Sequence, residues 1–185
     1  MKPPAEHAHL SWTLAERVPA HDYGIFRTAF RDGTHPQVAD RKRFSVIDTA
    51  DWVNVIAMTP ERSVVLVRQF RAGTAELCLE IPGGMVDPGE DPAVAVAREL
   101  FEETGYRADT WSRLGVVKPN PAILSNRLHI FLAEGAYAAG PAQPEGCEVI
   151  DVELLPLPKV WRAIAEGTID HALVVAAFAQ LAVSV

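Results

Sequence analysis

The segment from Asp91 to Gly105 carries the clearest structural signal in this chain of 185 residues. Asp91 is a favourable N-cap, and Pro92 fits the first helical position, where its missing N–H costs nothing. Gly105 supplies a typical C-terminal stop. Between them lies an apolar stripe with helical spacing, formed by Ala93, Val96, Ala97 and Leu100. The pattern therefore predicts a helix over 92–104 that packs one face against a core.

Short runs rich in apolar and β-branched residues surround this helix and predict strands. The runs cover 53–58, 64–70 and 77–81 before the helix, and 114–117, 128–133 and 149–155 after it. Two further helices are expected over 160–165 and 170–182, with Gly167 closing the first. Strands, one helix, more strands and terminal helices together predict an α/β sandwich with a mixed central sheet.

The N-terminal part of the chain has a weaker and more polar pattern. Turn signals at Asp32-Gly33 and His35-Pro36 predict one or two strands that form a hairpin outside the main core. We expect residues 1–45 to form an arm that serves dimerisation and residues 46–185 to form the main domain.

The net charge and the cysteines indicate which partners and which cellular compartment to expect. Seventeen basic and 24 acidic residues give a net charge of -7, which disfavours sequence-independent binding of nucleic acid. Cys78 and Cys147 lack zinc-ligand spacing and are expected to be buried or unreactive thiols in a reducing compartment. With neither an export signal nor a membrane span in view, we expect a cytoplasmic protein with no membrane partner. The six histidines show no paired spacing and receive no role.

Three carboxylates share one side of the predicted helix. Glu99, Glu102 and Glu103 are three and four residues apart, so they can converge. A solvated charged face is the commoner outcome of such a pattern. Here, however, the tight Gly83-Gly84 turn and an acidic loop precede the helix and bring backbone close to its acidic side. Oxygen ligands of this kind are what Mg²⁺ or Mn²⁺ prefers.

The stretch GGMVDPGEDPAVAVARELFEETGY resembles a complete Nudix box, with the pattern G-x5-E-x7-R-E-U-x-E-E-x-G-U. The pattern is filled by Gly84, Glu90, Arg98, Glu99, Leu100, Glu102, Glu103, Gly105 and Tyr106. Seven fixed identities at this spacing would arise by chance with a probability on the order of 10⁻⁶. The resemblance implies a Nudix-type α/β/α sandwich and divalent-metal-dependent cleavage of a phosphoanhydride.

The resemblance also implies roles for the residues of the box. Glu99 and Glu103 would be the main metal ligands, Glu102 would share a second or third ion, and the backbone carbonyl of Gly83 would join them. Arg98 would hold the glutamates in position through bidentate hydrogen bonds, with Glu90 as a partner. The metal would neutralise the phosphates and lower the pKa of the attacking water.

The preceding stretch, VVLVRQFRAGTAELCLEIPGGMVDPGE, resembles the ADP-ribose and nucleotide-sugar pyrophosphatase branch of the family. In that branch an RQ-aromatic-R strand and a glutamate before the glycine turn recur, and here they supply Arg68, Arg71 and Glu80 as candidate substrate-binding residues. Arg71 is the candidate for a substrate phosphate, against the alternative of a solvent-facing charge. Trp52 is the candidate for stacking on the base, against the alternative of a core residue.

Later residues supply the remaining candidates. Pro121 stands sixteen residues beyond Gly105, as in this branch, but within Asn-Pro-Ala rather than the usual Ser-Pro-Gly, which keeps ADP-glucose and GDP-mannose open beside ADP-ribose. Asn126 would line the same pocket or serve as a loop hydrogen-bonder. The branch places a catalytic base late in the chain, for which Glu148 is favoured and Glu145 is the alternative.

Together these features predict a homodimeric enzyme that uses Mg²⁺ or Mn²⁺ to hydrolyse a nucleoside diphosphate sugar to a nucleoside monophosphate and a sugar phosphate. One alternative is a Nudix-fold ligand-binding or regulatory module without hydrolysis, although such modules normally lose a box glutamate. The other is a housecleaning hydrolase of nucleoside triphosphates, against which the Arg68-to-Arg71 element and the N-terminal arm argue.

Overall fold

The computed structural model describes residues 5–146 and 148–184. Cys147 lies outside the described residues. The chain forms two compact units, which we call the N-terminal unit (residues 1–50 with 120–126) and the main unit (51–119 with 127–185).

The N-terminal unit begins with the short 3₁₀ helix η1 (Ala5–Leu10) and continues as a three-stranded antiparallel sheet. Its strands are β1 (Thr13–Asp22), β2 (Arg27–Thr34) and β3 (Arg41–Asp48), in the order β1-β2-β3. The sequence pattern predicted one or two strands in this unit. It did not predict the third strand, because β3 begins with the polar run RKR and none of its residues is fully buried. The loop 120–126 joins this unit, since the Ile47 N–H donates to the carbonyl of Ile123 at 2.8 Å.

A seven-stranded mixed sheet forms the centre of the main unit. Its strands are β4 (Trp52–Met58), β5 (Ser63–Arg71), β6 (Glu76–Glu80), β7 (Gly83–Met85), β9 (Thr110–Val117), β10 (Leu128–Glu134) and β12 (Ile150–Pro156). The main path runs β12-β5-β4-β10-β9, while β6 pairs with β5 and β7 pairs with β4. Strand β10 is parallel to β4 and the other pairs are antiparallel, so the predicted mixed sheet is confirmed. A small ladder joins β8 (Tyr106–Arg107) to β11 (Tyr137–Ala138).

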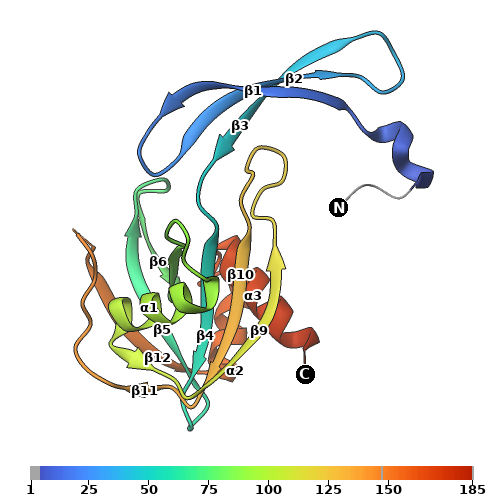
Figure 1. Ribbon diagram of the computed structural model, residues 1–185. Coiled ribbons are helices and arrows are strands. Elements are labelled where there is room, and N and C mark those ends of the chain that lie inside the picture. Colours follow the sequence, from blue (N-terminus) through green and yellow to red (C-terminus); the bar gives the residue numbers. More distant parts are fainter. Residues whose placement is uncertain (1–4, 147, 185) are drawn as a thin grey trace. The chain divides into compact units, whose positions relative to one another are not determined.

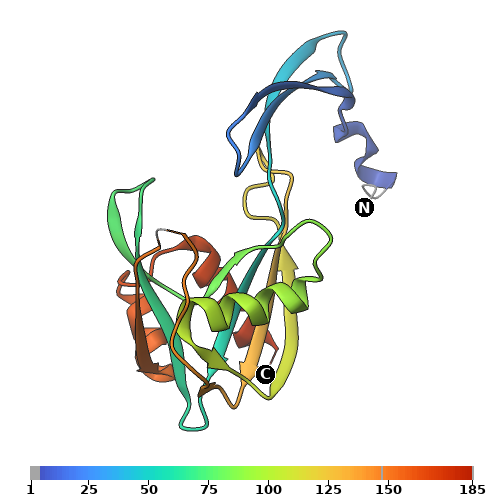
Figure 2. The ribbon, with the colours of Figure 1, turned by 60° about the vertical axis from the view of Figure 1, so that its left-hand side comes forward.

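Helices cover both faces of this sheet, as Figures 1 and 2 show, with α1 (Pro92–Thr104) on one face and α2 (Leu157–Ala165) and α3 (Ala172–Val183) on the other. Because side chains alternate along a strand, β4 serves two cores. Val53 and Val55 pack with the apolar residues of α1, while Ile56 packs with those of α2 and α3. The predicted α/β/α sandwich is confirmed.

Helix α1 has the predicted bounds, because its caps are local. The side chain of Asp91 accepts a hydrogen bond from the Ala93 N–H at 2.8 Å, and Gly105 adopts the left-handed conformation with φ of 72°. Among the helices of the described residues, none is long and apolar enough to cross a membrane.

Candidate active site

The glycine turn and helix α1 are brought together by β7, which pairs with β4 so that Gly83 lies opposite Asn54. The Gly83 N–H donates to Oε2 of Glu103 at 2.9 Å. A Cβ at Gly84 would collide with the carboxylate of Glu99. A side chain at Gly84 would displace this carboxylate, and one at Gly83 would collide with the backbone carbonyl of Val53, so glycine allows the turn to pack closely between β4 and the acidic side of α1.

Arg98 is the centre of the carboxylate cluster. It binds Glu90 through two parallel contacts, from Nε to Oε1 and from Nη2 to Oε2, both 3.1 Å long. Its Nη1 donates to Oε1 of Glu99 at 3.0 Å and to Oε2 of Glu102 at 2.9 Å. The hydrogen bonds to Glu90, together with those to Glu102, raise the pKa of Arg98 and keep it charged. One guanidinium thus holds three box carboxylates.

The cluster holds more negative charge than its partners neutralise. Burial raises the pKa of Glu99 to about 7 despite the opposing charge of Arg98, and the charges of Glu102 and Glu148 raise it further. Burial raises the pKa of Glu103 to about 8, because this side chain is only 4% exposed and the Gly83 N–H compensates in part. The charge of Glu148 also raises the pKa of both residues, so this loop carboxylate lies within electrostatic reach of them.

The donor chemistry of this cluster fits a hard divalent cation. All candidate donors are oxygen atoms, and a cation would relieve the uncompensated charge. Within residues 5–146 and 148–184, no three His, Cys, Asp or Glu side chains stand ready as a formed ligand shell. The carboxylates are held by Arg98 and by the Gly83 N–H instead.

A pocket of about 590 Å³ opens beside the glycine turn, within the main unit. Its walls come from β4, the β5–β6 hairpin, β7 and the start of α3. Of the residues proposed from the sequence, it brings together Trp52, Arg71, Glu80 and Gly83. Sequence reasoning gave no pocket role to the other lining residues, among them Asn54, Cys78, Asp170 and His171. Trp52 also packs against the core cluster that includes residues of α3, as its alternative role proposed, and its stacking role stays a prediction.

An ion pair between Arg71 and Glu80 lies among the residues that line this pocket. Nε and Nη2 of Arg71 donate to Oε1 and Oε2 of Glu80 at 2.7 and 2.8 Å. Burial alone would raise the pKa of Glu80, but the contacts with Arg71 and His171 outweigh it and lower the pKa to about 2. Glu80 is therefore an anchored anion at neutral pH.

Four other sequence candidates lie away from this pocket's lining residues. Arg68 donates to Glu153 of β12 at 2.6 Å. Pro121 and Asn126 belong to the N-terminal unit, where Nδ2 of Asn126 donates to the carbonyl of Ala50 at 3.0 Å. Glu145 is exposed on the loop before β12. The roles proposed for these residues stay predictions.

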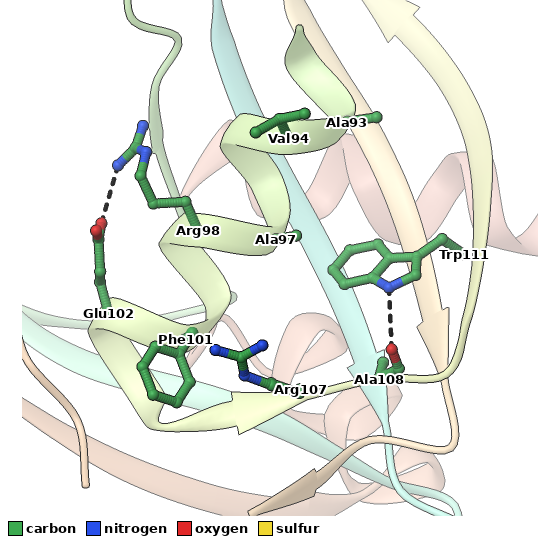
Figure 3. Close-up of a pocket in the computed structure, with 9 residues that line it drawn as sticks. All are labelled: Ala93, Val94, Ala97, Arg98, Phe101, Glu102, Arg107, Ala108 and Trp111. Carbon is green, nitrogen blue, oxygen red and sulfur yellow. Dashed lines mark hydrogen bonds and ion pairs between the residues drawn. The ribbon is translucent and has the colours of Figure 1, made fainter. Parts of the chain in front are cut away.

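The outer side of α1 carries a second pocket, of about 530 Å³ (Figure 3). Its walls are mainly apolar, with Val94, Ala97 and Phe101 on the helix facing Trp111 of β9. The guanidinium of Arg107 covers the ring of Phe101 at 4.6 Å. Arg98 and Glu102 of the carboxylate cluster also line this pocket, whereas Glu99 and Glu103 lie against the glycine turn, beside the first pocket.

Comparison with known proteins finds a matching family and similar sequences. A model of the NUDIX domain matches residues 49–178. The ADP-ribose pyrophosphatase of Bacillus subtilis is 38% identical over 82 residues, which cover 44% of this chain and 44% of that protein. The GDP-mannose pyrophosphatase of Cronobacter sakazakii is 28% identical over 170 residues, which cover 86% and 88% of the two chains. The chain spans about half the length of other curated relatives that it matches.

A solved structure also shares the fold. The crystal structure of a protein described as an ADP compounds hydrolase superposes with a TM-score of 0.81 at 21% identity, covering 92% of this chain and 91% of that one. At this identity the match is informative about the fold alone.

Proposed function

The chain belongs to the NUDIX domain family, and from this premise we propose that it hydrolyses the pyrophosphate bond of a nucleoside diphosphate sugar with the help of Mg²⁺ or Mn²⁺. One observation carries the proposal: the carboxylate cluster of α1 borders a pocket large enough for a nucleotide and lined by an arginine and a tryptophan. The pyrophosphatase relatives support the same class of substrate.

In this proposal Glu99, Glu102, Glu103 and the carbonyl of Gly83 hold the divalent cation. When bound, the cation supplies neutralisation of the diphosphate and activation of water. Arg98 holds the carboxylates in position and offsets their mutual repulsion, as its contacts with Glu90, Glu99 and Glu102 support.

Glu148 is the proposed catalytic base from the family resemblance, and its effect on the pKa of both Glu99 and Glu103 supports a position near the cluster. It takes a proton from the attacking water, whose oxygen bonds to one phosphorus of the diphosphate. The bond from that phosphorus to the bridging oxygen breaks, and the bridging oxygen leaves with the other phosphate. The products are a nucleoside monophosphate and a sugar phosphate. Glu145 remains the alternative base.

The pocket residues have matching roles. Arg71 binds a phosphate oxygen, and Trp52 stacks on the nucleobase or sugar. Arg68, Pro121 and Asn126 are kept as proposed substrate contacts on the resemblance alone.

We also propose that the enzyme is a cytoplasmic homodimer joined through its N-terminal unit. The sheet of this unit exposes apolar side chains on β1 and β2, among them Val18, which lies opposite Phe30 in the ladder. Exposed apolar pairs of this kind are typical of interfaces.

A phosphate-release screen with Mg²⁺ and a coupling phosphatase tests the proposed function. The panel holds ADP-ribose, ADP-glucose, UDP-glucose, GDP-mannose, NADH, diadenosine polyphosphates and dNTPs. We expect nucleotide sugars to be cleaved with kcat/KM of about 10⁴ M⁻¹s⁻¹ or more. Turnover of triphosphates alone would favour the housecleaning hydrolase, and no turnover with metal demonstrably bound would favour a binding module.

A further inference from the structure

We propose that His171, at the start of α3, is a positioning residue that acts through Glu80 to hold the guanidinium of Arg71 in the pocket. The inference rests on the proposed function, in which Arg71 meets a substrate phosphate, and it adds a residue to which the sequence assigned no role.

The three side chains form a chain of contacts that starts at a buried carboxylate. The side chain of Glu80 is 3% exposed. Its Oε2 accepts from Nη2 of Arg71 at 2.8 Å and lies 3.2 Å from Nδ1 of His171. Oε2 of Glu80 therefore contacts both Arg71, the last residue of β5, and His171, the N-cap of α3.

Nδ1 of His171 has no other partner among the described residues. The atom is buried, and even its contact with Glu80 falls short of hydrogen-bond geometry, although the distance is short. A buried ring nitrogen is costly to leave unsatisfied, so a small adjustment toward Oε2 is favoured. Nδ1 of His171 therefore lies close to Oε2 of Glu80, and a small rotation of the side chain would complete a hydrogen bond between them.

The two side chains that contact Glu80, those of Arg71 and His171, differ in conformational freedom. Arg71 is a long side chain, 45% exposed, which loses rotamer entropy when it is held in one position. His171 is short, and its carbonyl accepts from the N–H groups of Val174 and Val175 at 3.0 and 3.1 Å, which ties it to the first turn of α3. The backbone of His171 is therefore held by α3, and the short side chain of His171, 38% exposed, links α3 to Arg71 through Glu80.

The arrangement leaves part of Arg71 free for a ligand. Nε and Nη2 are engaged by Glu80, whereas Nη1 has no hydrogen-bond partner in the described part of the chain. Arg71 also reaches the carboxylate cluster electrostatically, since its charge lowers the pKa of Glu103 against the larger effect of burial. A guanidinium fixed at two nitrogens is well suited to bind a phosphate with the third.

The test compares His171→Ala and His171→Asn in the full chain, with His9→Ala as the control, because His9 is an exposed histidine of η1 outside this pocket. Asparagine places an amide nitrogen close to the position of Nδ1. With the best substrate of the screen, we expect His171→Ala to raise KM about 10-fold and change kcat less than about 2-fold, as loss of uniform binding predicts. His171→Asn should restore most of the wild-type KM, and His9→Ala should leave both constants unchanged.

A second readout does not depend on turnover. The Nε–H resonance of Arg71, assigned by its absence in Arg71→Lys, should be sharp in the wild type and in His171→Asn, and broadened or shifted in His171→Ala. If wild-type protein cleaves nothing in the panel but this resonance behaves as expected, the proposed function fails and the positioning role stands.

Two results would overturn the inference. The first is an unchanged KM and an unchanged Arg71 resonance in His171→Ala. The second is a fall in kcat that His171→Asn does not rescue. Should His171→Ala fail to fold, His171→Gln provides the loss variant, because its amide reaches toward the position of Nε2 and not of Nδ1.

Discussion

Glu103 shows at the scale of a single residue how burial and function conflict. Its carboxylate is almost closed off from solvent and is satisfied by one hydrogen bond, from the Gly83 N–H. Burying a carboxylate without a full counter-charge is costly, and such groups are commonly found where a protein binds a cation or a reacting group.

Glu103→Gln therefore separates the fold from the proposed activity. The amide oxygen of glutamine can still accept from Gly83, so we expect an unchanged circular dichroism spectrum and a Tm no lower than that of the wild type. Loss of the charge should lower kcat by a factor on the order of 10² to 10³ or more. Glu166→Gln, at the exposed C-cap of α2, is the matched control and should retain full activity. Wild-type rates in Glu103→Gln would refute the metal-site assignment.

Glu80 makes a second prediction, which concerns the pH dependence of stability. Its pKa is about 2 in the folded protein and about 4.5 in an unfolded chain, so the unfolded state binds the proton more readily. The stabilisation is present above pH 4.5 and is lost as the pH falls toward 2. The lost free energy of unfolding should be on the order of 3 kcal/mol.

Urea unfolding from pH 6 to pH 2 measures this effect. The variant Glu80→Gln should begin less stable at pH 6 and lose less free energy of unfolding on acidification than the wild type. Parallel pH curves for the two proteins would show that the Arg71–Glu80–His171 contacts do not contribute in this way.

At the scale of elements, α1 was predicted to the residue because its signals are local: a side-chain cap, a proline at the first position and a left-handed glycine. Strand β7 was missed for the opposite reason. Its sequence, Gly-Gly-Met, has no strand propensity, and it forms by pairing with β4. The site thus combines an element that the sequence specifies with one that only the tertiary structure creates.

A comparison of Gly105, which ends α1, with Gly89, in the loop before α1, tests the packing around the end of this helix. A Cβ at Gly105, where φ is 72°, would collide with the carbonyl of Gly140, whereas one at Gly89, where φ is 84°, would meet nothing. Gly89→Ala should cost about 1–2 kcal/mol from backbone strain alone, and Gly105→Ala should cost distinctly more. Equal free energies of unfolding for the two variants would contradict the packing described at the end of α1.

At the scale of the whole molecule, the sequence predicts the sandwich and the box but not the pocket. The Arg71–Glu80 pair could be suspected from the branch resemblance, since both residues flank one hairpin. The approach of His171 depends on where α3 begins relative to β6, which no local pattern encodes. Likewise, the loop 120–126 joins the N-terminal unit through backbone contacts with Ile47. The hydrophobic periodicity of the sequence does not predict these contacts.

The proposed homodimer makes a prediction at this scale. Val18→Lys adds a charge to the exposed face of β1, so sedimentation velocity should find a wild-type dimer and a monomeric variant. Lys159→Ala, which changes an exposed residue of α2, should remain dimeric. A dimer that survives Val18→Lys would place the interface elsewhere, and a monomeric wild type would remove the dimer altogether.

³¹P NMR of ADP-ribose with the enzyme and Mg²⁺ tests the proposal that the carboxylates of α1 direct hydrolysis of a sugar-linked diphosphate. If the proposal holds, the paired diphosphate signals give way to two monophosphate signals, those of AMP and ribose 5-phosphate, and Glu103→Gln leaves the diphosphate intact over the same time. Persistence of the diphosphate signals with the wild-type protein, for ADP-ribose and for ADP-glucose and GDP-mannose in turn, would contradict it.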